Sequence, residues 1–230
     1  MRKILTGLAL TLASGLAQAT EVSGSVTFTS DYRFRGVSQT AGDPAVQGSL
    51  DAAFDSGISI GMWGTNLDFG DGDDTKVEID YYIGYGDDIN DDLSYAVTFS
   101  RFTYPGKSGK STDYNELAGS LYYGDLSLTL AHTNDYSNTG EAGSYAAVDY
   151  SYGVTDEISL DLHAGTSFGK YWGSADIKDY EDYSVGLSGS VAGVDLSASY
   201  LFNSISGGDK TKSGAFRNDN TLVVAVSRAL

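Results

Sequence analysis

Charged residues occupy every second position in several stretches of this 230-residue chain, with apolar or aromatic residues between them. In one stretch Asp31, Arg33 and Arg35 alternate with Tyr32 and Phe34. Side chains of a β-strand point alternately to its two faces, so such a stretch would present one charged and one apolar face. Carboxylates gathered inside a closed barrel would concentrate cations and repel anions. The candidates for such a lumen lining are Asp31, Arg33, Arg35, Asp51, Glu78, Asp80, Glu116, Asp149, Asp161 and Asp182.

The strands that must position these residues are visible as alternating segments. The first, residues 25–36, would place Val26, Phe28, Tyr32 and Phe34 on its apolar face. About twelve segments of this kind follow one another, each separated from the next by turn or loop residues. They cover residues 25–36, 45–54, 58–69, 77–85, 93–100, 115–123, 126–130, 145–152, 158–168, 182–188, 196–202 and 220–230.

The third segment, residues 58–69, is the least regular. Its apolar residues up to position 62 lie on one parity, and those from position 63 onward lie on the other. Glycine within a strand often marks a β-bulge, which would reconcile the two halves. We therefore expect a bulge near Gly61 or Gly64.

The connections between segments alternate in length. Longer or more polar ones at 37–44, 70–75, 105–112, 137–143, 169–179 and 204–216 are separated by mostly tight turns. Bacterial outer-membrane barrels have this asymmetry and an even strand number, which leaves both termini in the periplasm. The chain is thus predicted to be all-β, an antiparallel transmembrane β-barrel of about 12 strands.

The first 19 residues have the pattern of a secretory signal peptide. A basic start, Met1 to Lys3, precedes an apolar run and the small-residue site Ala17-Gln18-Ala19. We expect cleavage there, leaving residues 20–230 as one outer-membrane barrel domain. The 14 basic residues would fall to 12 against 31 acidic ones, a net charge of about −19.

This charge argues against nucleic acid as a partner, because phosphates require a basic surface. The absence of cysteine excludes disulfides and thiolate sites. We expect no cofactor and no metal centre. The acidic loops around Asp73 and Asp91 leave calcium binding open, although neither has an EF-hand pattern.

Residues 30–40, 44–51 and 63–66 together resemble the TorF family of proteobacterial porins. These segments read SDYRFRGVSQT, PAVQGSLD and WGTN. The resemblance is strong over the first quarter of the mature chain and general beyond it. It implies an outer-membrane β-barrel, and it transfers no catalytic residue.

The predicted function is a porin-like channel in the outer membrane of a Gram-negative bacterium. It would allow passive diffusion of small solutes or ions, with cation preference from the acidic lumen, and would contact outer-membrane lipid and lipopolysaccharide. A non-conducting structural or adhesive barrel, whose charges fill a closed interior, is an alternative. The pattern leaves the oligomeric state open.

We expect no enzymatic activity, although a lipid hydrolase acting on phospholipid or lipopolysaccharide acyl chains is a further alternative. Such enzymes pair a serine with a histidine, and only His132 and His163 are available. His163 shares a strand face with Asp161 and Ser159, but residues two apart on a strand are separated by about 6.6 Å. His132 continues the apolar face of its segment near the outer interface.

Overall fold

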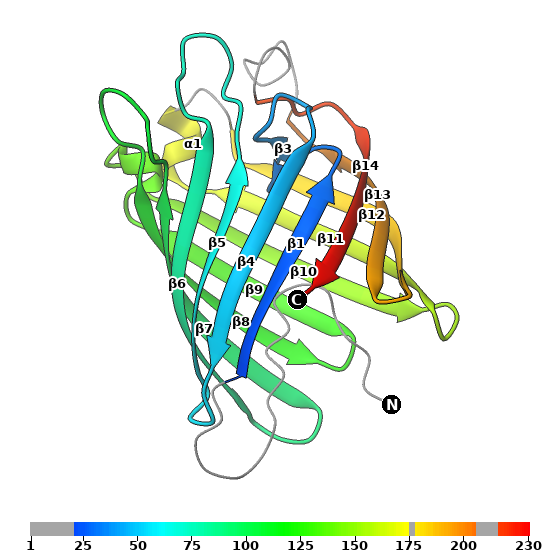
Figure 1. The fold of residues 1–230 in the computed structure, drawn as a ribbon. Helices are drawn as coiled ribbons and strands as arrows, with labels where there is room; N and C mark the ends of the chain where they lie inside the picture. The colour runs from blue at the N-terminus through cyan, green and yellow to red at the C-terminus, as the bar shows by residue number, and fades with distance from the viewer. Residues whose placement is uncertain (1–20, 175–177, 206–215) are drawn as a thin grey trace.

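Twelve antiparallel strands close into a barrel in the computed structural model, which describes residues 21–174, 178–205 and 216–230 (Figure 1). The predicted signal peptide lies outside the described residues. Each strand pairs with its neighbour along the chain, and the first pairs with the last to close the wall. The strands are β1 (Glu21–Thr29), β4 (Ala45–Ala53), β5 (Ile58–Asn66), β6 (Val77–Asp88), β7 (Leu93–Thr103), β8 (Tyr114–Tyr123), β9 (Leu126–Thr133), β10 (Gly143–Gly153), β11 (Ile158–Phe168), β12 (Tyr180–Val191), β13 (Val194–Asn203) and β14 (Thr221–Ala229).

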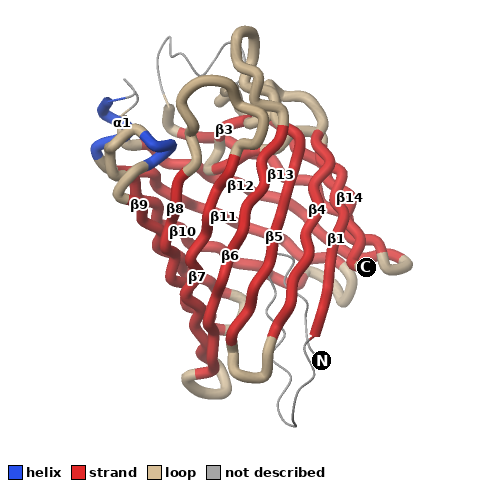
Figure 2. The backbone as a smooth tube through the Cα atoms, turned by 60° about the vertical axis from the view of Figure 1, so that its left-hand side comes forward, coloured by secondary structure: helices blue, strands red, loops and turns tan. Residues whose placement is uncertain are grey.

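Long connections gather at one end of the barrel and tight turns at the other, as predicted (Figure 2). The long ones carry the hairpin strands β2 (Arg33–Phe34) and β3 (Val37–Ser38), the single-turn 3₁₀-helix η1 (Tyr136–Asn138) and the short α1 (Lys170–Ser174). Among the described residues, no helix is long and apolar enough to cross a membrane.

The outer surface of the barrel is apolar and the inner surface is polar. Phe28 and Leu130 are 59% and 66% exposed, and the other large apolar side chains of the strands alternate outward in the same way. Inward positions carry hydroxyl pairs that bond across strands, such as Ser120 with Thr129 at 2.9 Å. A soluble protein would bury such an apolar belt, whereas lipid covers it in an outer-membrane barrel. The predicted fold class is therefore confirmed.

The first strand is shorter than the predicted segment 25–36. It ends at Thr29, so the prediction was wrong for Tyr32 and Phe34, which leave the wall instead of facing lipid. The chain reverses at Arg35 and Gly36, whose φ angles are 50° and 79°. Two successive residues with positive φ form the tight turn that joins β2 to β3.

The expected bulge in β5 is absent. The register of β5 with β4 and with β6 runs without a skipped residue through both Gly61 and Gly64. The apolar parity changes because Trp63 faces inward, where its ring lies 5.3 Å from that of Tyr32. Leu67 lies beyond the end of the strand and is buried. The change of parity at Trp63 thus reflects an aromatic contact inside the barrel and not a β-bulge.

Leu130→Arg is expected to lower the free energy of unfolding by about 2–4 kcal/mol, because it places a charge on the lipid face. Thr129→Arg is the matched control, since Thr129 faces the interior. Urea titration in lipid vesicles, followed by the heat-modifiable band on a gel, measures both. Equal losses for the two variants would contradict the assignment of faces.

Candidate pore and its inserted loop

Residues 30–44, here called the inserted loop, fold into the mouth of the barrel. Figures 1 and 2 both place β3 at the end where the long connections gather. A Cβ atom built on Gly36 would lie 2.7 Å from the Cβ of Asp182 on β12, so the loop reaches the inner wall at that strand. Tyr180, also on β12, donates a hydrogen bond of 3.0 Å to the carbonyl of Arg35. Only glycine fits this close approach with a positive φ.

Asp31 organises the base of the inserted loop. Its carboxylate accepts hydrogen bonds from Arg33 Nε at 2.7 Å, Ser38 Oγ at 2.6 Å and Thr40 Oγ1 at 3.2 Å. Arg33 also donates to the carbonyl of Asp219, in the connection before β14, at 2.8 Å. Both charged side chains of the Asp31–Arg33 pair are buried. These bonds hold the reversed chain as one unit against the barrel wall.

Arg35 clamps the tip of the loop to the wall. Its Nη2 donates to both carboxylate oxygens of Glu116 on β8, at 2.7 and 2.8 Å, and each side chain of the pair is only 7% exposed. The guanidinium lies 4.6 Å from the ring centre of Phe34 and 4.4 Å from that of Tyr145 on β10. Hydrogen bonds between charged groups are stronger than those between neutral groups, and cation–π contacts are stronger when they are shielded from water.

A second network lies beside Arg35. His163 on β11 places Nδ1 2.6 Å from Asp149 Oδ1 and Nε2 2.9 Å from Asp182 Oδ1. Carboxylates only accept hydrogen bonds, so the ring donates from both nitrogens and is positively charged. Tyr145 donates to the same Asp182 oxygen at 3.1 Å. One histidine therefore compensates two carboxylates from β10 and β12.

The wall opposite this network is acidic. Glu78 and Asp80 on β6 are both buried. Burial first, and the charge of Glu78 next, raise the pKa of Tyr32 in the inserted loop and of Tyr104 after β7 well above the usual value. Both phenols thus stay protonated beside that carboxylate.

An aromatic cluster closes the mouth of the barrel next to the Arg35–Glu116 ion pair, here called the clamp. Tyr114 on β8 stacks with Phe102 on β7 at 4.6 Å, and Tyr136 of η1 lies 4.9 Å from Tyr114. Trp172 of α1 continues the cluster, 5.2 Å from Tyr136. These rings anchor two further long connections to the wall. The inserted loop therefore packs beside an ordered aromatic cluster.

All ten candidate residues lie in the barrel or its inserted loop; four of them form two direct ion pairs, and two more are bridged by a histidine. The structure brings together Asp31 with Arg33, Arg35 with Glu116, and Asp149 with Asp182 through His163. The remaining ones line the wall. Asp51 accepts from the Tyr82 hydroxyl, Asp161 accepts from Ser151 Oγ at 2.7 Å, and Glu78 lies beside Asp80.

Lys76 shares the sequence parity of Glu78 and Asp80, but it does not join them in the interior. It precedes β6, its side chain is 61% exposed, and Nζ bonds to Asp68 at 3.1 Å. Sequence reasoning missed the roles of His163 and Tyr145 as partners of the acidic residues. Their inward parity was readable, but pairing across strands depends on register, which alternation does not fix.

The acidic connection before β6 is tied to the next long connection. Lys107 Nζ lies 2.6 Å from Asp73 Oδ2, and the backbone N–H of Ser108 donates to Asp74 Oδ1 at 2.9 Å. Within the described residues no group of three or more histidine, aspartate or glutamate side chains is placed to hold a metal ion.

The Asp73–Lys107 pair predicts an unusual titration. Burial alone would raise the pKa of Asp73, but hydrogen bonds from Lys107 and Thr75 outweigh it and lower the pKa to about 2. Because the folded pKa is depressed, the stabilisation is present above the ordinary value of about 3.9 and is lost as the pH falls through about 2. Carboxyl NMR of Asp73 is expected to show this midpoint, Lys107→Met to raise it toward 3.9, and Lys110→Met to leave it unchanged.

Comparison with solved structures finds porin folds. The KdgM porin has a TM-score of 0.52 at 11% identity, covering 90% of this chain and 98% of its own. The NanC porin gives 0.55 at 8% identity, covering 91% and 98%. An outer-membrane channel from Pseudomonas putida F1 gives 0.55 at 11% identity, covering 94% and 97%. At these identities the similarity establishes the fold.

A search of curated proteins gave no match. A family model, by contrast, matches residues 13–230, nearly the whole chain. With its twelve-stranded outer-membrane barrel, the chain belongs to the Gcw_chp family of bacterial proteins of unknown function.

Proposed function

We propose that this protein is a porin-like channel of the TorF type that favours cations over anions. The observation that carries the proposal is the charge of the interior. Eight carboxylates among the candidate residues face two arginines, and His163 is the one further cation in contact with them among the described residues. Such an excess of negative charge raises the local concentration of cations in a narrow, low-dielectric passage.

The comparison with KdgM bears on which solutes the proposed channel would exclude. One structure of that porin is described as a complex with oligogalacturonate, a sugar polymer that carries carboxylates. A polyanion of this kind would be repelled by interior carboxylates that have no cationic partner among the described residues, such as Asp51 and Asp161, whose partners are hydroxyl groups. We therefore propose small cations and neutral solutes for this channel.

Reversal potentials in planar bilayers under a KCl gradient test the selectivity. The expected sign is that of a cation-preferring channel. Asp51→Asn and Asp161→Asn, which remove interior charges away from the Arg35 clamp, are expected to reduce the preference. Asp156→Asn, in the exposed turn between β10 and β11, is the matched control and should leave it unchanged. Anion preference of the wild type would overturn the proposal.

A barrel closed by the inserted loop is the second candidate, supported by the buried Arg35–Glu116 clamp. It predicts no conductance in the wild type and conductance once the clamp is removed. If neither the wild type nor the variant without the clamp conducts, the barrel is purely structural and the channel proposal is overturned as well.

A further inference from the structure

A polar group lies on the lipid-facing side of the barrel, near the end with the long connections. His132 on β9 and Ser144 on β10 are direct cross-strand partners. They have the same outward parity as Leu130, which is 66% exposed. His132 Nδ1 lies 2.8 Å from Ser144 Oγ, and Nε2 lies 3.0 Å from Asn134 Oδ1. Serine, histidine and an amide oxygen thus form one continuous hydrogen-bonded line.

The partners of the ring fix its tautomer. The amide oxygen of Asn134 can only accept, so Nε2 carries the proton and donates to it. Nδ1 then has a free lone pair, which accepts the hydrogen bond of the Ser144 hydroxyl. A histidine in this state can act as a general base toward serine, and its acceptor Asn134 holds the ring in place. His163 is different, because both its nitrogens face carboxylates.

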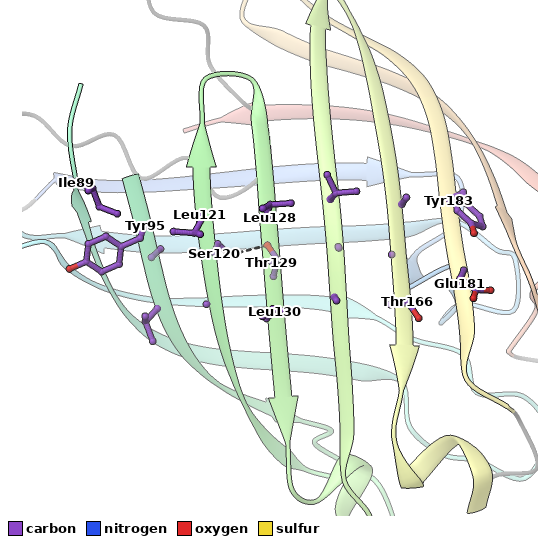
Figure 3. A pocket seen from close by; sticks show the side chains of 18 residues that line it. Ile89, Tyr95, Ser120, Leu121, Leu128, Thr129, Leu130, Thr166, Glu181 and Tyr183 are labelled. Atoms are coloured by element: carbon purple, nitrogen blue, oxygen red, sulfur yellow. Dashed lines mark hydrogen bonds between the residues drawn. The ribbon is translucent and has the colours of Figure 1, made fainter. Parts of the chain in front are cut away.

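An apolar groove runs along the wall below this group. Two adjoining depressions of about 410 and 820 Å³ share Val97, Gly119 and Leu130 in their lining, and the smaller one also includes His132 and Ser144. Figure 3 shows Leu121 and Leu128 from adjacent strands along the larger one. A Cβ atom on Gly119 would meet nothing within 4 Å, so this glycine leaves the floor open.

The position of the groove identifies its occupant. It lies in the apolar belt of a membrane barrel, where lipid acyl chains are the surrounding medium. From Ser144 to Val148 the groove follows the strand for about 14 Å, at roughly 3.4 Å per residue. An acyl chain lying there would bring its ester carbonyl to the level of Ser144.

We propose that Ser144, His132 and Asn134 form a hydrolytic site for acyl esters of membrane lipids. Ser144 Oγ bonds to the ester carbonyl carbon as its proton passes to His132 Nδ1. The carbon–oxygen ester bond then breaks, and the leaving alcohol takes that proton. Water attacks the acyl-serine, gives its proton to His132, and the fatty acid leaves as Ser144 is reprotonated. Asn134 is a positioning residue, since its side chain hydrogen-bonds to the histidine and to no other group among the described residues.

The first test is covalent labelling of the full-length protein in detergent with a short-chain fluorophosphonate. Mass spectrometry is expected to find the adduct on Ser144. Ser144→Ala should abolish it, and His132→Ala should slow it roughly 100-fold or more. Ser56→Ala removes an exposed hydroxyl in the turn between β4 and β5, outside the groove, and is the matched control. Wild-type labelling no greater than that of Ser144→Ala would overturn the proposal.

Asn134 is tested by rescue. Asn134→Asp keeps an oxygen acceptor for Nε2–H and should retain labelling, whereas Asn134→Leu should lose most of it. Equal labelling rates in the two variants would show that Asn134 has no positioning role in such a site and would overturn the three-residue arrangement.

The second test measures fatty acid release from phosphatidylethanolamine vesicles and, in a separate arm, from vesicles containing lipopolysaccharide. Release in either arm that depends on Ser144 supports the proposal and names the lipid source. Gly119→Leu fills the groove, so it should slow release of long chains while leaving short-chain labelling intact. Release in neither arm would overturn the proposal. Ser144→Ala should keep wild-type conductance, which separates this site from the channel.

Discussion

Arg35→Ala is expected to raise the single-channel conductance severalfold by releasing the inserted loop from the barrel wall. The variant leaves the Glu116 carboxylate buried without its cation, and it removes the contacts with the Phe34 and Tyr145 rings. Loss of one member of a buried ion pair costs about 3–5 kcal/mol. A cost of that size shifts the equilibrium between the docked and released loop by roughly a hundredfold or more.

Arg101→Ala is the matched control for this prediction. Arg101 pairs with Asp113, but the two side chains are 42% and 26% exposed, and such surface pairs contribute about 0–1 kcal/mol. Its conductance should equal that of the wild type. Glu116→Gln removes the same ion pair from the opposite side and should change conductance in the same direction as Arg35→Ala. Unchanged conductance in both clamp variants would contradict a constriction held by this pair.

The barrel could be predicted from the sequence because its determinants are local and repetitive. Alternation of apolar and polar residues gave twelve segments, and the structure has twelve wall strands with the same order of long and short connections. In β6 and β10 even the outward residues, such as Ile83 and Val148, are those that parity indicated. Where one face of a strand meets lipid and the other is polar, the alternation of side chains strongly determines which residues point outward.

The inserted loop could not be predicted for the same reason. Residues 30–36 keep the alternation of the preceding strand, so parity alone extends that strand to Gly36. Their direction is decided by long-range partners, among them Glu116 and Asp219, and by the positive φ at Arg35. Because Glu116 and Asp219 are distant in the sequence, and alternation carries no signal for a positive φ at an arginine, Arg33 and Arg35 could be assigned to the interior while their route into it could not. The pairing of His132 with Ser144 was hidden in the same way by the register of β9 and β10.

Gly165→Val is expected to lower the free energy of unfolding by about 3 kcal/mol. A Cβ atom on Gly165 of β11 would lie 2.1 Å from the Tyr145 hydroxyl oxygen and 2.6 Å from the carbon that bears it, so the ring must swing away. That movement breaks its hydrogen bond to Asp182 and its contact with Arg35. Hydrogen bonds to charged groups contribute about 1.5–3 kcal/mol, and overpacking adds to the loss.

The same displacement predicts a functional effect, because Tyr145 supports the guanidinium that clamps the inserted loop. Gly165→Val should therefore also raise conductance, and its combination with Arg35→Ala should raise it by less than the product of the two single effects. Gly119→Val is the control, since a side chain there meets open space on the lipid face and should alter neither unfolding nor conductance. Urea titration in vesicles and single-channel recording measure the two effects. If the conductance effects of Arg35→Ala and Gly165→Val simply multiply, Tyr145 does not couple the barrel wall to the clamp.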